Sequence, residues 1–225
     1  MPDAAPAGHP RSEPPVAVPS PRDALLLLKE GNSRFASGKC QHPNMSAERM
    51  RELARKGQQP FAAILACSDS RCPVERLFDR GIGDLFVVRV GGGVCGADVI
   101  ASIEFAVIHV ATPLLVVMGH TRCAAVSAVV AGTQLPESMA PVVSKIRAAM
   151  AAAQRNFSHL RGDDLVPEVV KANVWQALAD VLRGSAAARQ RVGAGKLAAH
   201  GALYHIDSGK VEWLGPHPDQ ARLLA

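Results

Sequence analysis

The sequence predicts an α/β domain whose mainly parallel β-sheet is flanked by helices. Four short apolar runs, at residues 61–66, 85–90, 114–118 and 198–206, have the length and composition of buried strands. Segments with apolar residues at helical spacing lie between these runs. With 225 residues, of which 48% are hydrophobic, the chain is long enough to bury one full core. This alternation of strands and helices is typical of a parallel sheet with helical crossovers.

The N-terminal part is predicted to contain an arm followed by two helices. Residues 1–21 combine repeated prolines with alanine, glycine and serine, so we expect them to be disordered or draped over a partner subunit. A helix is predicted to begin after Pro21 and to end at Gly31, and a second to span residues 46–56 with Ser46 as its N-cap. The rest of the chain, residues 22–225, is predicted to form a single domain that starts with this helical arm.

Two thiols and one imidazole stand where predicted strands end. The first apolar run closes on Cys-Ser-Asp-Ser-Arg at residues 67–71, and the third closes on His-Thr-Arg-Cys at residues 120–123. Structural zinc sites generally use four protein ligands, whereas catalytic sites use three and keep one position open. We therefore predict a catalytic site in which Cys67, His120 and Cys123 bind one zinc ion per chain.

A shared metal also constrains the order of the strands. Ligands gather at the carboxyl ends of parallel strands, and the first and third strands must be neighbours if their ends hold one ion. This predicts the strand order 2-1-3-4. Further helices are predicted between and after the strands, at residues 98–110, 123–130, 141–153, 167–183 and 186–192.

Together these motifs resemble those of the beta-class carbonic anhydrases. The likeness extends to shorter stretches at residues 31–35, 57–61, 83–89, 102–107 and 201–204, so only the N-terminal arm lies outside it. The resemblance implies the same strand order, with an antiparallel fifth strand after a turn at residues 208–210. It also implies self-association to a dimer or tetramer, in which the apolar residues 24–28 would clasp a neighbouring subunit.

The resemblance implies a lyase that interconverts carbon dioxide and bicarbonate, with zinc-bound hydroxide attacking carbon dioxide. Two sulfur anions cancel the charge of the ion, so neighbouring groups must help to activate the bound water. Asp69 is predicted to orient that water. Arg71 is predicted to hold Asp69 in a bidentate pair that keeps it ionised and turned away from the metal; if the pair breaks, Asp69 could bind zinc itself.

The same resemblance implies that Gln58, Phe86 and Phe105 line an apolar pocket for carbon dioxide. Some positions differ from the family pattern. Phe105 stands where plant-type relatives often carry tyrosine, Gly93 where asparagine is common, and Ala124 where glycine is usual. We expect activity to survive these changes.

Two other functions remain open. Hydrolysis of carbon disulfide or carbonyl sulfide could use the same metal centre, because fold and ligands do not fix the substrate. A non-catalytic zinc-stabilised scaffold is motivated by Gly93 and Ala124, although the chain retains Asp69 and Arg71. Residues 91–96 also match the glycine pattern of dinucleotide-binding loops, but the next strand ends in Gly119 and His120 rather than in an acidic residue.

Composition argues against several classes of partner. The net charge of +5 is scattered, and no basic cluster is interleaved with aromatic residues, so nucleic-acid binding is not expected. No apolar stretch approaches the roughly eighteen residues of a membrane span, and no secretory signal is recognisable. Five cysteines are too few for a disulfide scaffold, and a cytoplasmic location fits them best.

Overall fold

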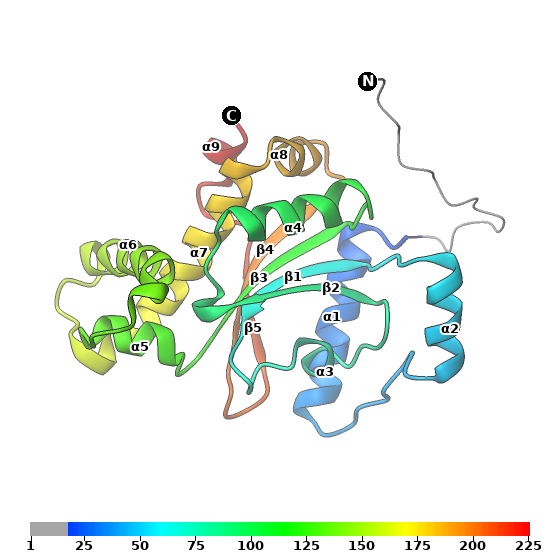
Figure 1. Cartoon of the computed structure of the whole chain (residues 1–225), viewed down its shortest axis with the longest axis horizontal. Coiled ribbons are helices and arrows are strands. Elements are labelled where there is room, and N and C mark those ends of the chain that lie inside the picture. Colours follow the sequence, from blue (N-terminus) through cyan, green and yellow to red (C-terminus); the bar gives the residue numbers. More distant parts are fainter. Residues whose placement is uncertain (1–17) are drawn as a thin grey trace.

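A computed structural model describes residues 18–225, so most of the predicted arm at residues 1–21 lies outside the described part. Five strands form one sheet in the order β2-β1-β3-β4-β5 (Figure 1). The first four strands run parallel, and β5 is antiparallel to β4. The predicted strand order and the antiparallel fifth strand are confirmed. The bounds are β1 (Ala62–Cys67), β2 (Leu85–Val90), β3 (Leu114–His120), β4 (Ala198–Tyr204) and β5 (Val211–Gly215).

Helices cover both faces of this sheet (Figure 1). One face packs against α4, α7 and α8, and the other against α1 and α3. Because both faces are covered, every residue of β1 and β3 is buried, which explains their unbroken apolar sequences. The helices are α1 (Pro21–Ala36), α2 (Ala47–Lys56), α3 (Val74–Leu77), α4 (Ala97–Ile108), α5 (Ala124–Val130), α6 (Ala140–Asn156), α7 (Val166–Gly184), α8 (Ala186–Gly193) and α9 (Gln220–Leu224).

The predicted end of the first helix at Gly31 is wrong, because α1 continues to Ala36. A Cβ atom on Gly31 would lie 1.8 Å from the carbonyl oxygen of Phe78, so glycine is needed for close packing rather than to stop the helix. The next residue, Asn32, accepts a hydrogen bond from the backbone N–H of Val211 at 2.9 Å. This part of α1 is therefore fixed by contacts with segments far away in the sequence.

Helix α7 packs closely on the carboxyl end of the sheet. A Cβ atom on Gly119, the residue before the end of β3, would lie 2.8 Å from a methyl carbon of Val174. From the same helix, the buried Asn173 amide donates a hydrogen bond of 2.8 Å to the carbonyl oxygen of Gly92. Gly92 belongs to the loop after β2 and has a φ of 69°, which glycine adopts without strain. The loop after β2 is thus tied to α7.

We expect Asn173→Ala to lower the free energy of unfolding by about 1–3 kcal/mol, because the buried Gly92 carbonyl loses its partner. Urea unfolding measures the change. Ser144→Ala is the control, since it removes an exposed hydrogen bond of 3.0 Å to the Pro141 carbonyl, and its effect is expected to stay within about 0.5 kcal/mol. Equal effects of the two variants would contradict the role given to Asn173.

Within residues 18–225, no helix combines the length and the apolar character that crossing a bilayer requires.

Candidate active site

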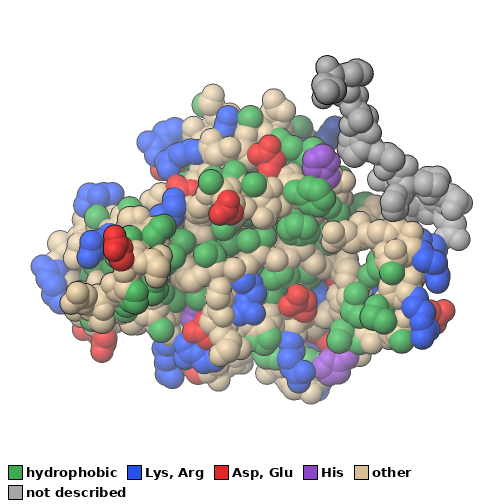
Figure 2. Space-filling model, in the orientation of Figure 1, with side chains coloured by type: hydrophobic (Ala, Val, Ile, Leu, Met, Phe, Trp, Pro, Cys, Tyr) green, Lys and Arg blue, Asp and Glu red, His purple; other side chains and the backbone are tan. Residues whose placement is uncertain are grey.

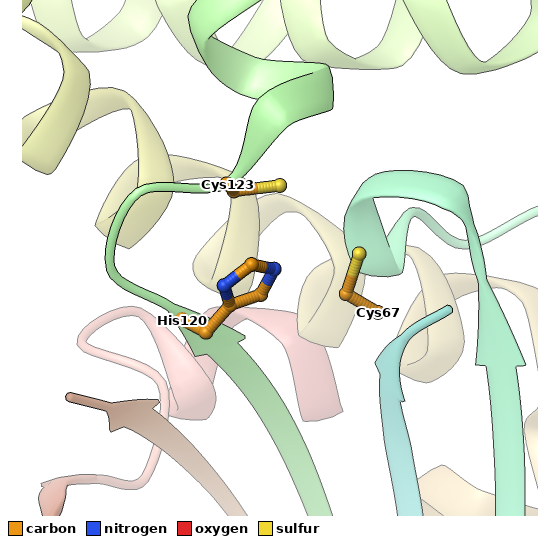
Figure 3. Close-up of side chains that lie close together, drawn as sticks. All are labelled: Cys67, His120 and Cys123. Atoms are coloured by element: carbon orange, nitrogen blue, oxygen red, sulfur yellow. The ribbon is translucent and has the colours of Figure 1, made fainter. Parts of the chain in front are cut away.

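Three side chains from separate segments meet at the carboxyl edge of the sheet. Cys67 ends β1, His120 ends β3, and Cys123 is the N-cap residue of α5. Since β1 and β3 are adjacent parallel strands, their last residues lie at the same edge. The two sulfur atoms and a ring nitrogen all lie within 4.8 Å of one another, and the side chains point into one common space (Figure 3).

The turn between His120 and Cys123 has an unusual backbone. Arg122 has a φ of 55°, a left-handed conformation that residues other than glycine adopt rarely. Its carbonyl oxygen accepts a hydrogen bond of 3.0 Å from Nη2 of Arg71. The backbone N–H of Thr121 donates to the carbonyl of Tyr204 on β4 at 2.9 Å. The turn is therefore held from both sides, and it directs His120 and Cys123 toward Cys67.

The chemistry of these groups fits a zinc ion. Nδ1 of His120 lies 2.9 Å from the carbonyl oxygen of Thr121, and because a carbonyl only accepts, Nδ1 donates the proton. In the neutral imidazole this leaves Nε2 with a free lone pair. That atom is buried and has no hydrogen-bond partner among the described residues. Two cysteine sulfurs and an imidazole nitrogen oriented by a backbone carbonyl form a typical zinc donor set.

The pKa values of the three residues in the cluster are strongly shifted from their usual values. A hydrogen bond from the thiol of Cys123, helped by the nearby His120 ring, lowers the pKa of Cys67 to about 4 despite its burial. The same hydrogen bond and burial raise the pKa of Cys123 well above its usual range. Burial works to lower the pKa of His120, but contacts with the sulfurs of Cys67 and Cys72 outweigh it and raise the pKa to about 10. These shifts favour a Cys67 thiolate beside a protonated His120 ring, and an ion bound here would displace the ring proton, because metal ligands bind in their deprotonated forms.

Asp69 and Arg71 form a two-point ion pair beside the cluster. Nε and Nη2 of Arg71 donate to the two carboxylate oxygens of Asp69 at 2.9 and 2.7 Å, and the Arg71 backbone N–H adds a third bond of 2.9 Å. These bonds, the side-chain pair first, hold the pKa of Asp69 well below its usual range. The same carboxylate approaches Nε2 of His120 to 3.8 Å. An ionised oxygen thus faces the space between the candidate ligands.

The three residues expected to line a substrate pocket lie elsewhere in this chain. Phe86 pairs with Ala63, four residues before the Cys67 end of β1, which is about 13 Å along the strand. The ring of Phe105 on α4 lies 6.2 Å from that of Phe86, and Gln58 is exposed in the segment before β1. A single chain does not bring Gln58, Phe86 or Phe105 to the cluster.

The residues that depart from the family pattern do not crowd the site. Ala124 is exposed, so it adds its methyl group at the protein surface. Gly93 has a φ of 63°, and a Cβ atom there would meet its nearest neighbour, the backbone nitrogen of Cys67, at an ordinary contact distance of 3.5 Å. Neither position therefore distorts the cluster of Cys67, His120 and Cys123.

Two contacts at the site were not foreseen from the sequence. One is the bond between Arg71 and the Arg122 carbonyl, for which no sequence pattern gives a signal. The other is made by Arg89, whose side chain donates to the carbonyl oxygens of Cys67 and Asp69. A signal for Arg89 did exist, since it is the one charged residue in an apolar strand and therefore needs a local partner.

Comparisons with known proteins agree on one family. A sequence profile of the carbonic anhydrase family matches residues 62–211. Carbonic anhydrase 2 of Mycobacterium tuberculosis is 38% identical over 195 residues, which cover 85% of this chain and 91% of that protein. A carbonic anhydrase of Mycolicibacterium smegmatis is 36% identical over 199 residues, covering 86% and 93% respectively. A beta-carbonic anhydrase from Aspergillus fumigatus superposes with a TM-score of 0.71 at 27% identity, covering 90% of this chain and 96% of that one.

Proposed function

Because the chain belongs to the beta-carbonic anhydrase family, we propose that it catalyses the reversible hydration of carbon dioxide to bicarbonate at the edge of its sheet. The observation that carries this proposal is the convergence of Cys67, His120 and Cys123 within 4.8 Å, with Nε2 of His120 buried and without a hydrogen-bond partner in residues 18–225. We propose that these three side chains hold one zinc ion per chain. Residues 22–225 would act as one domain, since their elements pack around one sheet.

When bound, zinc would supply a Lewis acid that lowers the pKa of a water molecule bound to it to about 7. The roles of Asp69 and Arg71 follow from their geometry. Asp69 is ionised and faces the space between the ligands, so it can accept a hydrogen bond from water and orient it for attack on carbon dioxide. Arg71 keeps that carboxylate charged and turned toward itself through two parallel bonds, which disfavours direct binding of Asp69 to the ion.

The pocket for carbon dioxide would be completed by a second copy of the chain. Within residues 18–225, strand β2 pairs only with β1, so it forms an edge of the sheet in this part of the chain. Beside it, α4 exposes Phe105 and Ile108, and a groove of ≈ 530 Å³ runs along the helix. Figure 2 shows hydrophobic side chains gathered over this region. A copy packed in reverse orientation against β2 and α4 would carry Phe86, Phe105 and Gln58 toward the cluster of its neighbour.

We expect Ile108→Glu to weaken self-association by roughly tenfold or more, because it places a charge in an apolar contact. Sedimentation velocity over a range of protein concentrations measures the shift toward monomer. Ala151→Glu is the matched control, since it adds the same charge at an exposed position of α6. If Ile108→Glu associated as strongly as the wild type, the contact between copies would not involve this part of α4.

The proposed activity is tested by stopped-flow hydration assays across pH, combined with metal analysis of the same preparation. Carbon disulfide and carbonyl sulfide are assayed side by side with carbon dioxide. Zinc at one per chain and fastest turnover of carbon dioxide support the proposal. Faster turnover of a sulfur compound would show that this compound, and not carbon dioxide, is the preferred substrate. Hydration of carbon dioxide at the uncatalysed rate in zinc-loaded protein would favour a non-catalytic, zinc-stabilised scaffold. A sharp loss of hydration as the pH falls would indicate that Asp69 enters the metal site.

A cytoplasmic location stays a prediction. It is supported by the five cysteines, all of which have free thiols.

A further inference from the structure

Arg89 stands out within β2, where the other five residues are apolar. Its Nε atom donates a hydrogen bond of 3.0 Å to the carbonyl oxygen of Cys67, and its Nη2 atom donates one of 2.6 Å to the carbonyl oxygen of Asp69. One planar guanidinium therefore spans the backbone of a candidate metal ligand and of the residue that would orient water. Both bonds go to main-chain carbonyls rather than to the thiol or the carboxylate.

The segment that Arg89 holds has little other support on this side. Regular pairing of β1 with β2 ends at Cys67 and Val90, and only one further backbone bond follows, from the N–H of Ser68 to the carbonyl of Val90 at 3.1 Å. The chain then turns away, and the Asp69 carbonyl also accepts from the backbone N–H of Cys72 at 2.9 Å. The side chain of Arg89 therefore adds hydrogen bonds between the two segments beyond the last backbone pair of β1 and β2.

The two arginines near the cluster hold different groups. Arg71 binds the carboxylate of Asp69 and the carbonyl of Arg122, so it fixes a side chain and the turn between His120 and Cys123. Among the described residues, the hydrogen bonds of the Arg89 side chain go to backbone carbonyls. A guanidinium presents its donors in a rigid fork, so two simultaneous bonds set the spacing of the carbonyls they reach. Lysine offers a single flexible ammonium and cannot set that spacing.

We propose that Arg89 is a positioning residue for the hydration reaction, an inference that rests on the proposed function. By fixing the backbone from Cys67 to Asp69, it sets the distance between the thiolate that binds the metal and the carboxylate that orients water. Arg89 is exposed in the single chain, so its two bonds contribute little to global stability. Its effect is expected in the geometry of the site.

The test compares Arg89→Ala and Arg89→Lys with Arg189→Ala. Arg189 is a matched control because it also binds two backbone carbonyls, those of Leu182 and Arg183 at 2.7 and 2.8 Å, at the junction of α7 and α8. In stopped-flow assays of the zinc-loaded full chain, Arg89→Ala is expected to lower kcat by about tenfold to a hundredfold with KM nearly unchanged. Arg89→Lys is expected to fall between Arg89→Ala and the wild type, and Arg189→Ala to stay within about twofold of wild type.

Two readouts do not depend on turnover. Zinc release to a chelator is expected to be about tenfold faster in Arg89→Ala, and the visible spectrum of the cobalt-substituted protein is expected to shift. The proposal would be overturned if Arg89→Ala kept the kcat, the rate of zinc release and the cobalt spectrum of the wild type. It would also be overturned if Arg189→Ala lost as much kcat as Arg89→Ala. If Arg89→Ala does not fold, Arg89→Lys decides by the same measurements. If the wild type hydrates no carbon dioxide, the proposed function fails, while zinc release and the cobalt spectra still test Arg89.

Discussion

His120→Asn is expected to lose carbon dioxide hydration together with its zinc. Structural zinc sites with four ligands are worth about 10–16 kcal/mol, so one ligand accounts for about 2.5–4 kcal/mol, or roughly a hundredfold to a thousandfold in affinity. The loss is expected at the upper end of this range, because His120 is 2% exposed and its ring is already oriented by the Thr121 carbonyl. Zinc content after dialysis and stopped-flow hydration of the same samples measure both effects.

His159→Asn makes the same chemical change at an exposed histidine in the segment after α6, and we expect it to keep its zinc and its activity. Because a vacant cavity could also destabilise the protein, urea unfolding of the metal-free forms is compared. Retention of one zinc per chain and of wild-type hydration in His120→Asn would show that the metal centre has been placed at the wrong residues.

The second large effect is expected for Asp69→Asn, which should keep its zinc but lose about a hundredfold or more in kcat. Asparagine has nearly the shape of aspartate, but its neutral amide accepts a weaker hydrogen bond from water than an ionised carboxylate does, and it forms no ion pair with the Arg71 guanidinium. Misplacement of a reacting group by about 1 Å can cost on the order of 10²-fold in rate. Metal analysis and stopped-flow kinetics together distinguish this variant from His120→Asn.

The pH dependence of the wild type follows from the same pair. Arg71 lowers the pKa of Asp69 below its usual range, so the carboxylate stays ionised in neutral buffers and does not set the hydration profile there. The stability from this shift is fully present above the ordinary aspartate pKa of about 3.9, and it is lost as the pH falls through the lower folded value. For Asp69→Asn, the matched control is Asp163→Asn, which makes the same chemical change at an exposed position. A wild-type kcat in Asp69→Asn would remove Asp69 from the mechanism.

Much of the fold could be predicted because the strands carry strong local signals. The strands β1 and β3 are buried on both faces, so their apolar runs are continuous, and the motifs at their ends required them to be neighbours. The failures have physical reasons as well. Gly31 was taken for a helix end, although its lack of a Cβ atom serves contact with Phe78. The short helices α3 and α9 were missed, because four or five residues show no helical periodicity.

The candidate site was predictable only in part. Residues at the ends of neighbouring parallel strands are brought together by topology, and this is how Cys67 and His120 could be paired from sequence. The predicted strand at residues 85–90 already places Phe86 near its amino end, away from the carboxyl ends that carry Cys67 and His120. Phe86 was assigned to the pocket by family likeness, yet its position in β2 separates it from the cluster of its own chain.

The left-handed backbone of Arg122 would link the affinity for the proposed zinc ion to the hydrogen bonds of Arg71. A residue other than glycine in this conformation costs about 1–2 kcal/mol, so the turn that carries His120 and Cys123 is under conformational tension. The bond from Arg71 to the Arg122 carbonyl opposes relaxation of that turn. Linkage is reciprocal, so an ion bound by His120 and Cys123 must in turn favour the strained turn. With an ion bound, its retention and the placement of the Asp69 carboxylate would therefore be one coupled equilibrium, because Arg71 bonds both to that carboxylate and to the Arg122 carbonyl.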